Sequence, residues 1–127
     1  DDLNYIMMRY PDVLLMKSEA LNNLGDNSND KYECLNIVRR RAGIKEITAA
    51  DGLTKEQFAD VILEERLHEL CCEHHRRFDL VRFGKLAEQV GKAYGVVLKD
   101  THNLYPIPQQ AIDNNDAMSD ADQNPGY

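Results

Sequence analysis

The sequence lacks tryptophan and has few cysteines, which limits the classes of protein it can belong to. Its three cysteines are Cys34, Cys71 and Cys72, and an odd number with one adjacent pair is a poor disulfide framework. We therefore expect free thiols, most of them small core residues. No stretch approaches the roughly 20 apolar residues that a membrane-spanning helix needs. The acidic first residues do not resemble the basic start of a signal peptide.

Positive charge is also scarce. The sequence has 15 lysine and arginine residues and 22 acidic residues, which gives a net charge of −7. A phosphate-binding surface has to be basic, so we exclude a nucleic-acid partner. The sequence has no glycine-rich phosphate loop, Walker pattern or Ser-His-Asp order either. With 43% hydrophobic and 29% charged residues, the 127 residues predict one small globular domain that spans residues 1–127.

The first third of the sequence predicts a helical hairpin over about 12–42. Pro11 and Asp12 suit the first turn of a helix, and Gly25 suits its end. A second helix follows after a short turn, so the two helices are expected to pack antiparallel over the length of one tetratricopeptide repeat. The predicted core stripe of the first helix is Val13, Leu14, Ala20, Leu21 and Leu24.

A long helix is predicted over about 54–74. Thr54 and Gln57 form a capping box, and Leu53 with Phe58 forms the hydrophobic staple that accompanies it.

The rest of the chain predicts less regular structure. A short helix is expected over about 77–83, and prolines fix Leu104 to Pro108 as extended chain in an irregular tail over about 96–127. The polar end of that tail is expected to lie on another part of the protein. The predicted fold class is all-α, with a tetratricopeptide-like hairpin, a long helix and an irregular, proline-containing C-terminal segment.

Charges of both signs alternate with apolar residues along the run from Glu65 to Gly84. Neighbouring carboxylates at Glu65, Glu69 and Glu73 suggest acid–base chemistry of the glycosidase type. Flanking arginines argue against it, because they keep carboxylates ionised whereas a general acid needs a raised pKa. We therefore favour a structural ion-pair lattice with ladder-like spacing. Its predicted members are Glu65, Arg66, Glu69, Glu73, Arg76, Asp79 and Arg82.

A metal site is an alternative for the same region. His68, Cys71, Cys72 and His75 share one face of a continuous helix, and imidazole and thiolate are zinc ligands. Four ligands from one helix rarely converge on a tetrahedron. We favour the interpretation that Cys71 or Cys72 faces the core, keep a metal-dependent hydrolase as a weaker hypothesis, and predict no cofactor.

The run from Glu65 to Gly84 resembles the signature of the SusD/RagB family, which are surface glycan-capture lipoproteins of Bacteroidetes. Segments on either side agree in the same order: Arg9–Asn22, Leu35–Gly43, Leu104–Pro108 and Asn124–Tyr127.

Three residues depart from the family pattern. Cys72 and His74 stand where the family commonly has Phe and Gly, and Phe83 stands where it commonly has Trp. These differences suggest local repacking within the same fold.

The resemblance implies an α-helical body that binds without catalysis. It implies capture of an oligosaccharide or polysaccharide and delivery to a SusC-like TonB-dependent transporter. It also implies a place on the outer-membrane surface, held by a lipid anchor whose signal and lipidated cysteine are not in this chain.

We expect this C-terminal portion to supply scaffold, and we assign no ligand-binding residue. Tyr94 and Tyr127 are the aromatic residues expected to be exposed. The alternative function is a tetratricopeptide-like protein–protein interaction scaffold.

Overall fold

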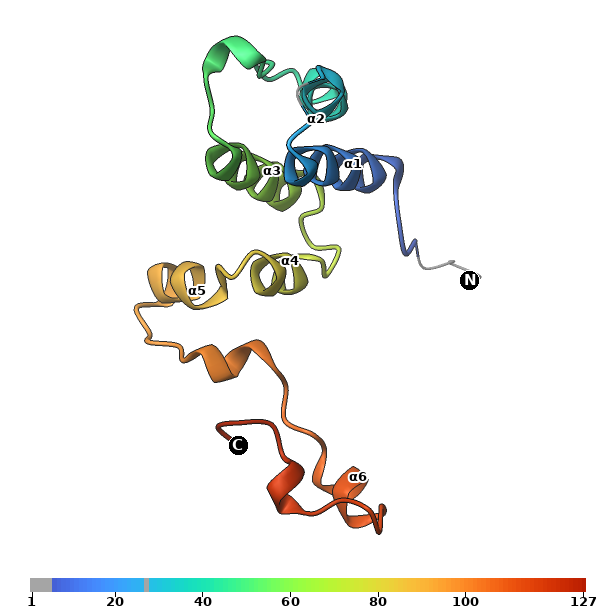
Figure 1. Cartoon of the computed structure of the whole chain (residues 1–127), viewed down its shortest axis with the longest axis vertical. Coiled ribbons are helices and arrows are strands. Elements are labelled where there is room, and N and C mark those ends of the chain that lie inside the picture. The colour runs from blue at the N-terminus through green and yellow to red at the C-terminus, as the bar shows by residue number, and fades with distance from the viewer. Residues whose placement is uncertain (1–5, 27) are drawn as a thin grey trace. The chain divides into compact units, whose positions relative to one another are not determined.

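The computed structural model describes residues 6–26 and 28–127, and every regular element in these two ranges is a helix (Figure 1). The all-α prediction is therefore confirmed. The chain divides into two compact units, residues 1–76 and 77–127, and each is described by itself. None of the described helices has the length and the apolar composition to cross a membrane.

Three helices build the first unit (Figure 1). α1 (Tyr10–Leu24) and α2 (Asp30–Arg41) form the predicted hairpin, and α3 (Lys55–Glu69) packs mainly against α1. A 3₁₀ turn, η1 (Ala49–Asp51), lies in the connector between α2 and α3. All three helices contribute to one core, whose buried members are Leu14, Leu15, Cys34, Leu35, Val38, Phe58 and Ile62.

The predicted core stripe of α1 is only partly right. Leu14 is buried and Leu21 is half-buried, whereas Val13, Ala20 and Leu24 are exposed. A prediction from hydrophobicity alone chose the wrong positions, because polar side chains occupy much of the buried face of α1. These side chains form hydrogen bonds or ion pairs there. That face follows helical spacing through Asp12, Leu15, Ser18 and Asn22.

Two buried asparagines show how the hairpin is tied to its connections. Asn22 donates from Nδ2 to the carbonyl of Lys55 at 2.9 Å and accepts a hydrogen bond from Lys31 Nζ at 3.3 Å. Asn36 donates to the carbonyl of Ile47 at 2.7 Å and accepts from the amide of Ile47 at 2.9 Å. These two side chains satisfy backbone groups of the connector between α2 and α3 and of the first residue of α3.

The start of α3 is the one predicted. The Thr54 amide donates to Gln57 Oε1 at 2.9 Å, and the Gln57 amide donates to Thr54 Oγ1 at 3.2 Å. Phe58 is 1% exposed, and Leu53 packs against the same core. The capping box and staple are therefore confirmed.

The end of α3 differs from the prediction. The helix was expected to run to about residue 74, but it ends at Glu69 and is followed by a series of turns. Cys72 and His74 have φ angles of 64° and 65°, in the left-handed region that a right-handed helix does not contain. Neither residue is glycine, which adopts this conformation most easily.

Short helices and turns make up the second unit. They are α4 (Arg76–Arg82), which begins at the last residue of the first unit, α5 (Leu86–Tyr94), η2 (Asp100–Asn103), α6 (Gln109–Asp113) and η3 (Asp120–Asp122). The predicted helix at 77–83 is displaced by one residue.

The end of the second unit lies on its proline-containing segment. Gln123 donates from Nε2 to the carbonyl of Ile107 at 2.9 Å and accepts from the Ile107 amide at 2.7 Å. The Tyr127 hydroxyl donates to the carbonyl of Leu104 at 3.1 Å. The expectation that the polar tail lies on another part of the protein is met by these contacts.

Replacement of Asn22 tests the role of buried asparagines. Asn22→Ala removes a partner from the Lys55 carbonyl, so we expect the free energy of unfolding to fall by about 1–3 kcal/mol. Asn23→Ala is the matched control, because Asn23 is the next residue of α1 and is exposed. Both changes raise helix propensity equally. Urea unfolding of the two variants measures the difference, and equal stability of the two would contradict the assignment.

Candidate functional site

The charged residues of α3 reach partners on the other two helices of the first unit. Arg66 Nη1 lies 2.7 Å from Asp12 Oδ1 of α1, and both side chains are only 5% exposed. Glu65 Oε2 accepts a hydrogen bond of 2.6 Å from Arg39 Nη1 of α2. The sequence pattern suggested ladders within one helix, but these contacts join α3 to α1 and α2.

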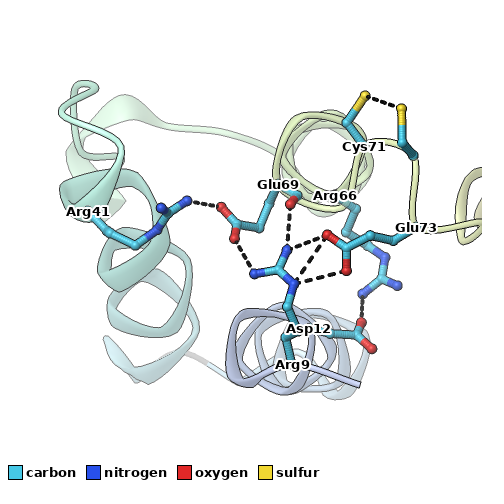
Figure 2. Close-up of polar contacts among 8 residues, drawn as sticks. Arg9, Asp12, Arg41, Arg66, Glu69, Cys71 and Glu73 are labelled. Atoms are coloured by element: carbon cyan, nitrogen blue, oxygen red, sulfur yellow. Dashed lines mark hydrogen bonds and ion pairs between the residues drawn. The ribbon is translucent and has the colours of Figure 1, made fainter. Parts of the chain in front are cut away.

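Arg9 makes the most extensive of these contacts. Its guanidinium lies between two carboxylates, with Nη1 3.0 Å from Glu69 Oε1 and Nη2 2.7 Å from Glu73 Oε1 (Figure 2). Its Nε also donates to Glu73 Oε2 at 2.9 Å. A planar group with five donors is suited to holding two acceptors at once.

The same arginine also stabilises the end of α3. Arg9 Nη2 donates to the backbone carbonyl of Glu69 at 2.7 Å. The last carbonyls of a helix have no partner within it and carry partial negative charge, so a guanidinium is favourable there. Arg9 is itself the residue before α1. The start of α1 and the end of α3 are therefore joined through one side chain.

The remaining predicted members have different partners. Arg41 of α2 forms a further ion pair with Glu69. Arg76 donates to the backbone carbonyl of Leu63 at 3.0 Å, so this contact is to the α3 backbone. In the second unit, Asp79 and Arg82 are paired at 3.1 Å with the i, i+3 spacing expected from the sequence.

Electrostatics around Glu73 do not suit a general acid. Its hydrogen bonds with Arg9 lower the pKa of its carboxyl below the ordinary value, and the pKa of the Arg9 guanidinium is raised by the same contact. A carboxyl that donates a proton at neutral pH needs a raised pKa. The geometry therefore favours an ionised carboxylate that holds a cation.

The metal-site hypothesis loses its geometric basis. His68 lies in α3, whereas Cys71, Cys72 and His75 come after the helix has ended, so the four residues do not share one helical face. Within residues 6–26 and 28–127, no group of three or more His, Cys, Asp or Glu residues is arranged to hold a metal ion. Both adjacent cysteines are exposed free thiols, so the expectation that one of them faces the core is wrong; only Cys34 is buried.

A shallow, open groove of about 360 Å³ lies beside the Arg39–Glu65 pair. Ile47 and Val61 form part of its apolar lining, and His68 also lines it. His68 Nε2 is 3.6 Å from Glu64 Oε1, across one turn of α3. The buried carboxylate lining this groove, Glu65, is thus already engaged with Arg39.

Exposed aromatic side chains occur in both units. Tyr94 and Tyr127 are 77% and 54% exposed, as predicted, and Tyr10, Phe78 and Tyr105 are also exposed. The Arg77 guanidinium lies 4.0 Å from the centre of the Tyr105 ring, and the same group donates to the carbonyl of His102 at 3.0 Å.

Sequence reasoning named the acidic and basic residues of α3 but missed their partners. These are Arg9, Asp12, Arg39 and Arg41. All four lie in the flanking segments that resemble family motifs. The available signal for these ion pairs was that residues of opposite charge occur in different motifs. Pairing them required knowledge of which helix faces which.

The hairpin of α1 and α2 with α3 packed on it defines a class of protein, the helical proteins with tetratricopeptide-like helix pairs. The match to family models is more specific. The model described as the SusD family matches residues 1–127, and the chain belongs to this family.

Named relatives agree with this assignment. The chain is 32% identical over 135 residues to SusD-like protein P2 of Formosa agariphila, covering 98% of this chain and 26% of the relative. It is 29% identical over 133 residues to the starch-binding protein SusD of Bacteroides thetaiotaomicron, covering 99% of this chain and 22% of that protein. The chain thus spans about a quarter of the length of the curated relatives it matches.

A solved structure supports the fold. The crystal structure of a SusD homologue from Bacteroides thetaiotaomicron matches with a TM-score of 0.75 and 33% sequence identity, over 95% of this chain and 25% of that chain. The helical arrangement described above is therefore shared with an experimentally determined member of the family.

Removal of Asp12 tests the buried ion pair. Asp12→Ala leaves Arg66 in a buried position without this carboxylate, so we expect the free energy of unfolding to fall by about 3–5 kcal/mol. Glu33→Ala is the matched control, because Glu33 is also an acidic residue in the first turn of a helix but its partner Arg40 is exposed. Chemical denaturation measures both variants. A loss for Asp12→Ala no larger than that for Glu33→Ala would show that the buried pair is not stabilising.

The Arg9–Glu73 contact predicts a pH dependence. Because the pKa of Glu73 is lower in the folded protein than in the unfolded chain, its contribution to stability is present above about pH 4.5 and is lost as the pH falls through the folded-state pKa. The melting temperature is therefore expected to fall in acid. Other carboxylates contribute to that fall, so the measured quantity is the difference in melting temperature between the unmodified protein and Glu73→Gln. That difference in melting temperature is expected to shrink as the pH falls below about 4.5; a difference that is constant from pH 7 to pH 3 would exclude the linkage.

Proposed function

We propose that this chain is part of a protein that captures glycans at the surface of a bacterial cell and passes them to a SusC-like TonB-dependent transporter of the outer membrane. Family membership over residues 1–127 is the observation that carries the proposal. One relative is named a starch-binding protein. The proposed activity is binding without catalysis, and the proposed location is the outer-membrane surface through a lipid anchor outside this chain.

Within that protein, we propose that the charged residues of the central motif serve as scaffold. The supporting observation is that each predicted charged residue of the first unit contacts an oppositely charged side chain or a backbone carbonyl at 3.0 Å or less. Groups that are fully engaged with one another contribute little to binding a neutral sugar, which is usually held by aromatic faces and hydrogen bonds on a preformed surface.

The scaffold role and the glycan role are tested together in the full-length protein. Affinity electrophoresis through gels containing different polysaccharides is expected to show retardation by at least one of them. Tyr94→Ala, which removes a ring that is 77% exposed in this chain, is expected to leave the dissociation constant unchanged. Asp12→Ala is expected to weaken retardation only to the extent that the protein unfolds, which circular dichroism of the same sample measures.

Two results would overturn these proposals separately. A protein that is retarded by none of the polysaccharides and does not co-purify with a transporter is not a glycan-capture component. A folded Asp12→Ala protein that has lost glycan affinity places the charged motif in the binding site instead of the scaffold.

A protein–protein interaction scaffold is the second candidate, and a specific feature of α1 favours it. An outer stripe of exposed residues runs along the helix at helical spacing, formed by Tyr10, Val13, Met16, Ala20 and Leu24. An apolar stripe of this kind is typical of a helix that packs against another helix on its outer side. Saturable binding of unrelated peptides to the full-length protein, abolished by Val13→Lys, would favour the interaction scaffold.

A further inference from the structure

The turn after α3 brings two exposed thiols into contact. Cys71 Sγ and Cys72 Sγ lie 3.7 Å apart, within hydrogen-bond distance for sulfur. Cys72 has a φ angle of 64°, which turns the backbone at this dipeptide. Neighbouring cysteines in a helix or strand do not meet in this way, because successive side chains there point in different directions.

The position of this pair in the chain links it to the Arg9 contacts. Glu69 precedes the pair and Glu73 follows it, and these are the two carboxylates that hold Arg9. Glu73 is bonded directly to Cys72, so a change in the backbone at Cys72 acts on the Glu73–Arg9 contact. The thiols themselves face solvent and are accessible to small molecules.

We propose that Cys71 and Cys72 form a reversible dithiol–disulfide site that reacts with small-molecule disulfides of the glutathione type. A thiolate of the pair attacks one sulfur of the small disulfide, forms a mixed disulfide and releases one small thiol. The second cysteine then attacks the protein sulfur of the mixed disulfide, closes the Cys71–Cys72 bond and releases the second small thiol. The two cysteines lose two protons and two electrons, and the small disulfide gains both.

Physical chemistry favours reversibility over permanent closure. A disulfide bond is about 2.05 Å long, so the sulfur atoms have to approach by about 1.7 Å. Adjacent Cα atoms are only about 3.8 Å apart, less than the 4.4–6.8 Å of ordinary disulfides, and the ring is therefore strained. Strained and exposed disulfides are the more easily reduced ones. The hydrogen bond with Cys72 raises the pKa of the Cys71 thiol, which keeps this thiol protonated at neutral pH.

Peptide mapping tests the proposal directly. The protein is equilibrated with mixtures of reduced and oxidised glutathione, quenched with acid, alkylated and cut with trypsin. Cleavage after Arg66 and Arg76 releases both cysteines in one peptide, 67–76. In oxidising mixtures this peptide is expected to be unalkylated and lighter than the reduced peptide by two hydrogen atoms, and dithiothreitol is expected to reverse the change.

Two internal comparisons make the result specific. Cys34 lies in a separate peptide, 32–39, and is buried, which raises the pKa of its thiol, so it is expected to stay reduced. Cys72→Ser removes one partner and is expected to give a glutathione adduct on Cys71. The proposal is overturned by a wild-type peptide 67–76 that remains alkylated at both cysteines in every mixture, that carries glutathione adducts without any intramolecular disulfide at equilibrium, or that is joined to a second chain.

The effect on Arg9 has its own readout. Closing the ring is expected to displace Glu73 from Arg9 and so to lower the melting temperature of the oxidised protein relative to the reduced protein. In Glu73→Gln this decrease is expected to be smaller, whereas in Glu33→Gln, which alters an exposed pair elsewhere, it is expected to be unchanged. An equal decrease in all three proteins would show that oxidation does not act through the Arg9 contact.

Discussion

The ion pairs that join α3 to the α1–α2 hairpin are the interaction on which the first unit depends. α3 lies against α1 and has little contact with α2, yet its charged residues reach both helices. Hydrophobic burial by Phe58 and Ile62 is non-directional and would tolerate small rotations of α3. The Asp12–Arg66 pair tolerates them less, because a buried guanidinium that loses its carboxylate is costly. We interpret the charged motif as the device that fixes the orientation of α3 on the hairpin.

Arg9 shows how the same device defines the length of a helix. It supplies the donor that the last carbonyl of α3 lacks, and it binds the carboxylates on both sides of the turn that follows. This turn requires left-handed backbone at Cys72 and His74. Neither residue favours that conformation as glycine does, so the tertiary contacts with Arg9 help to maintain it. A dense run of alternating charges can therefore be structural and still leave an exposed dithiol at its centre.

Local signals in the sequence were reliable, and long-range ones were not. The capping box of Thr54 and Gln57 and the helix stop at Gly25 depend on neighbouring residues only, and both are found. The early end of α3 was missed, and the side chain that satisfies its last carbonyl, Arg9, is 60 residues away in the sequence. Asp12 was read only as a favourable first-turn residue, because its buried partner lies on another helix. Motif resemblance recovered the fold, but it did not show which charges meet.

The central claim is that Asp12 and Arg66 are coupled as a structural pair, and a double-mutant cycle tests it most directly. The free energy of unfolding is measured for the protein, Asp12→Leu, Arg66→Met and the variant with both changes. The account predicts a coupling energy of about 1–3 kcal/mol, with the double variant more stable than at least one single variant, since replacing both partners leaves neither charge buried without the other. Additive effects of the two substitutions would contradict it.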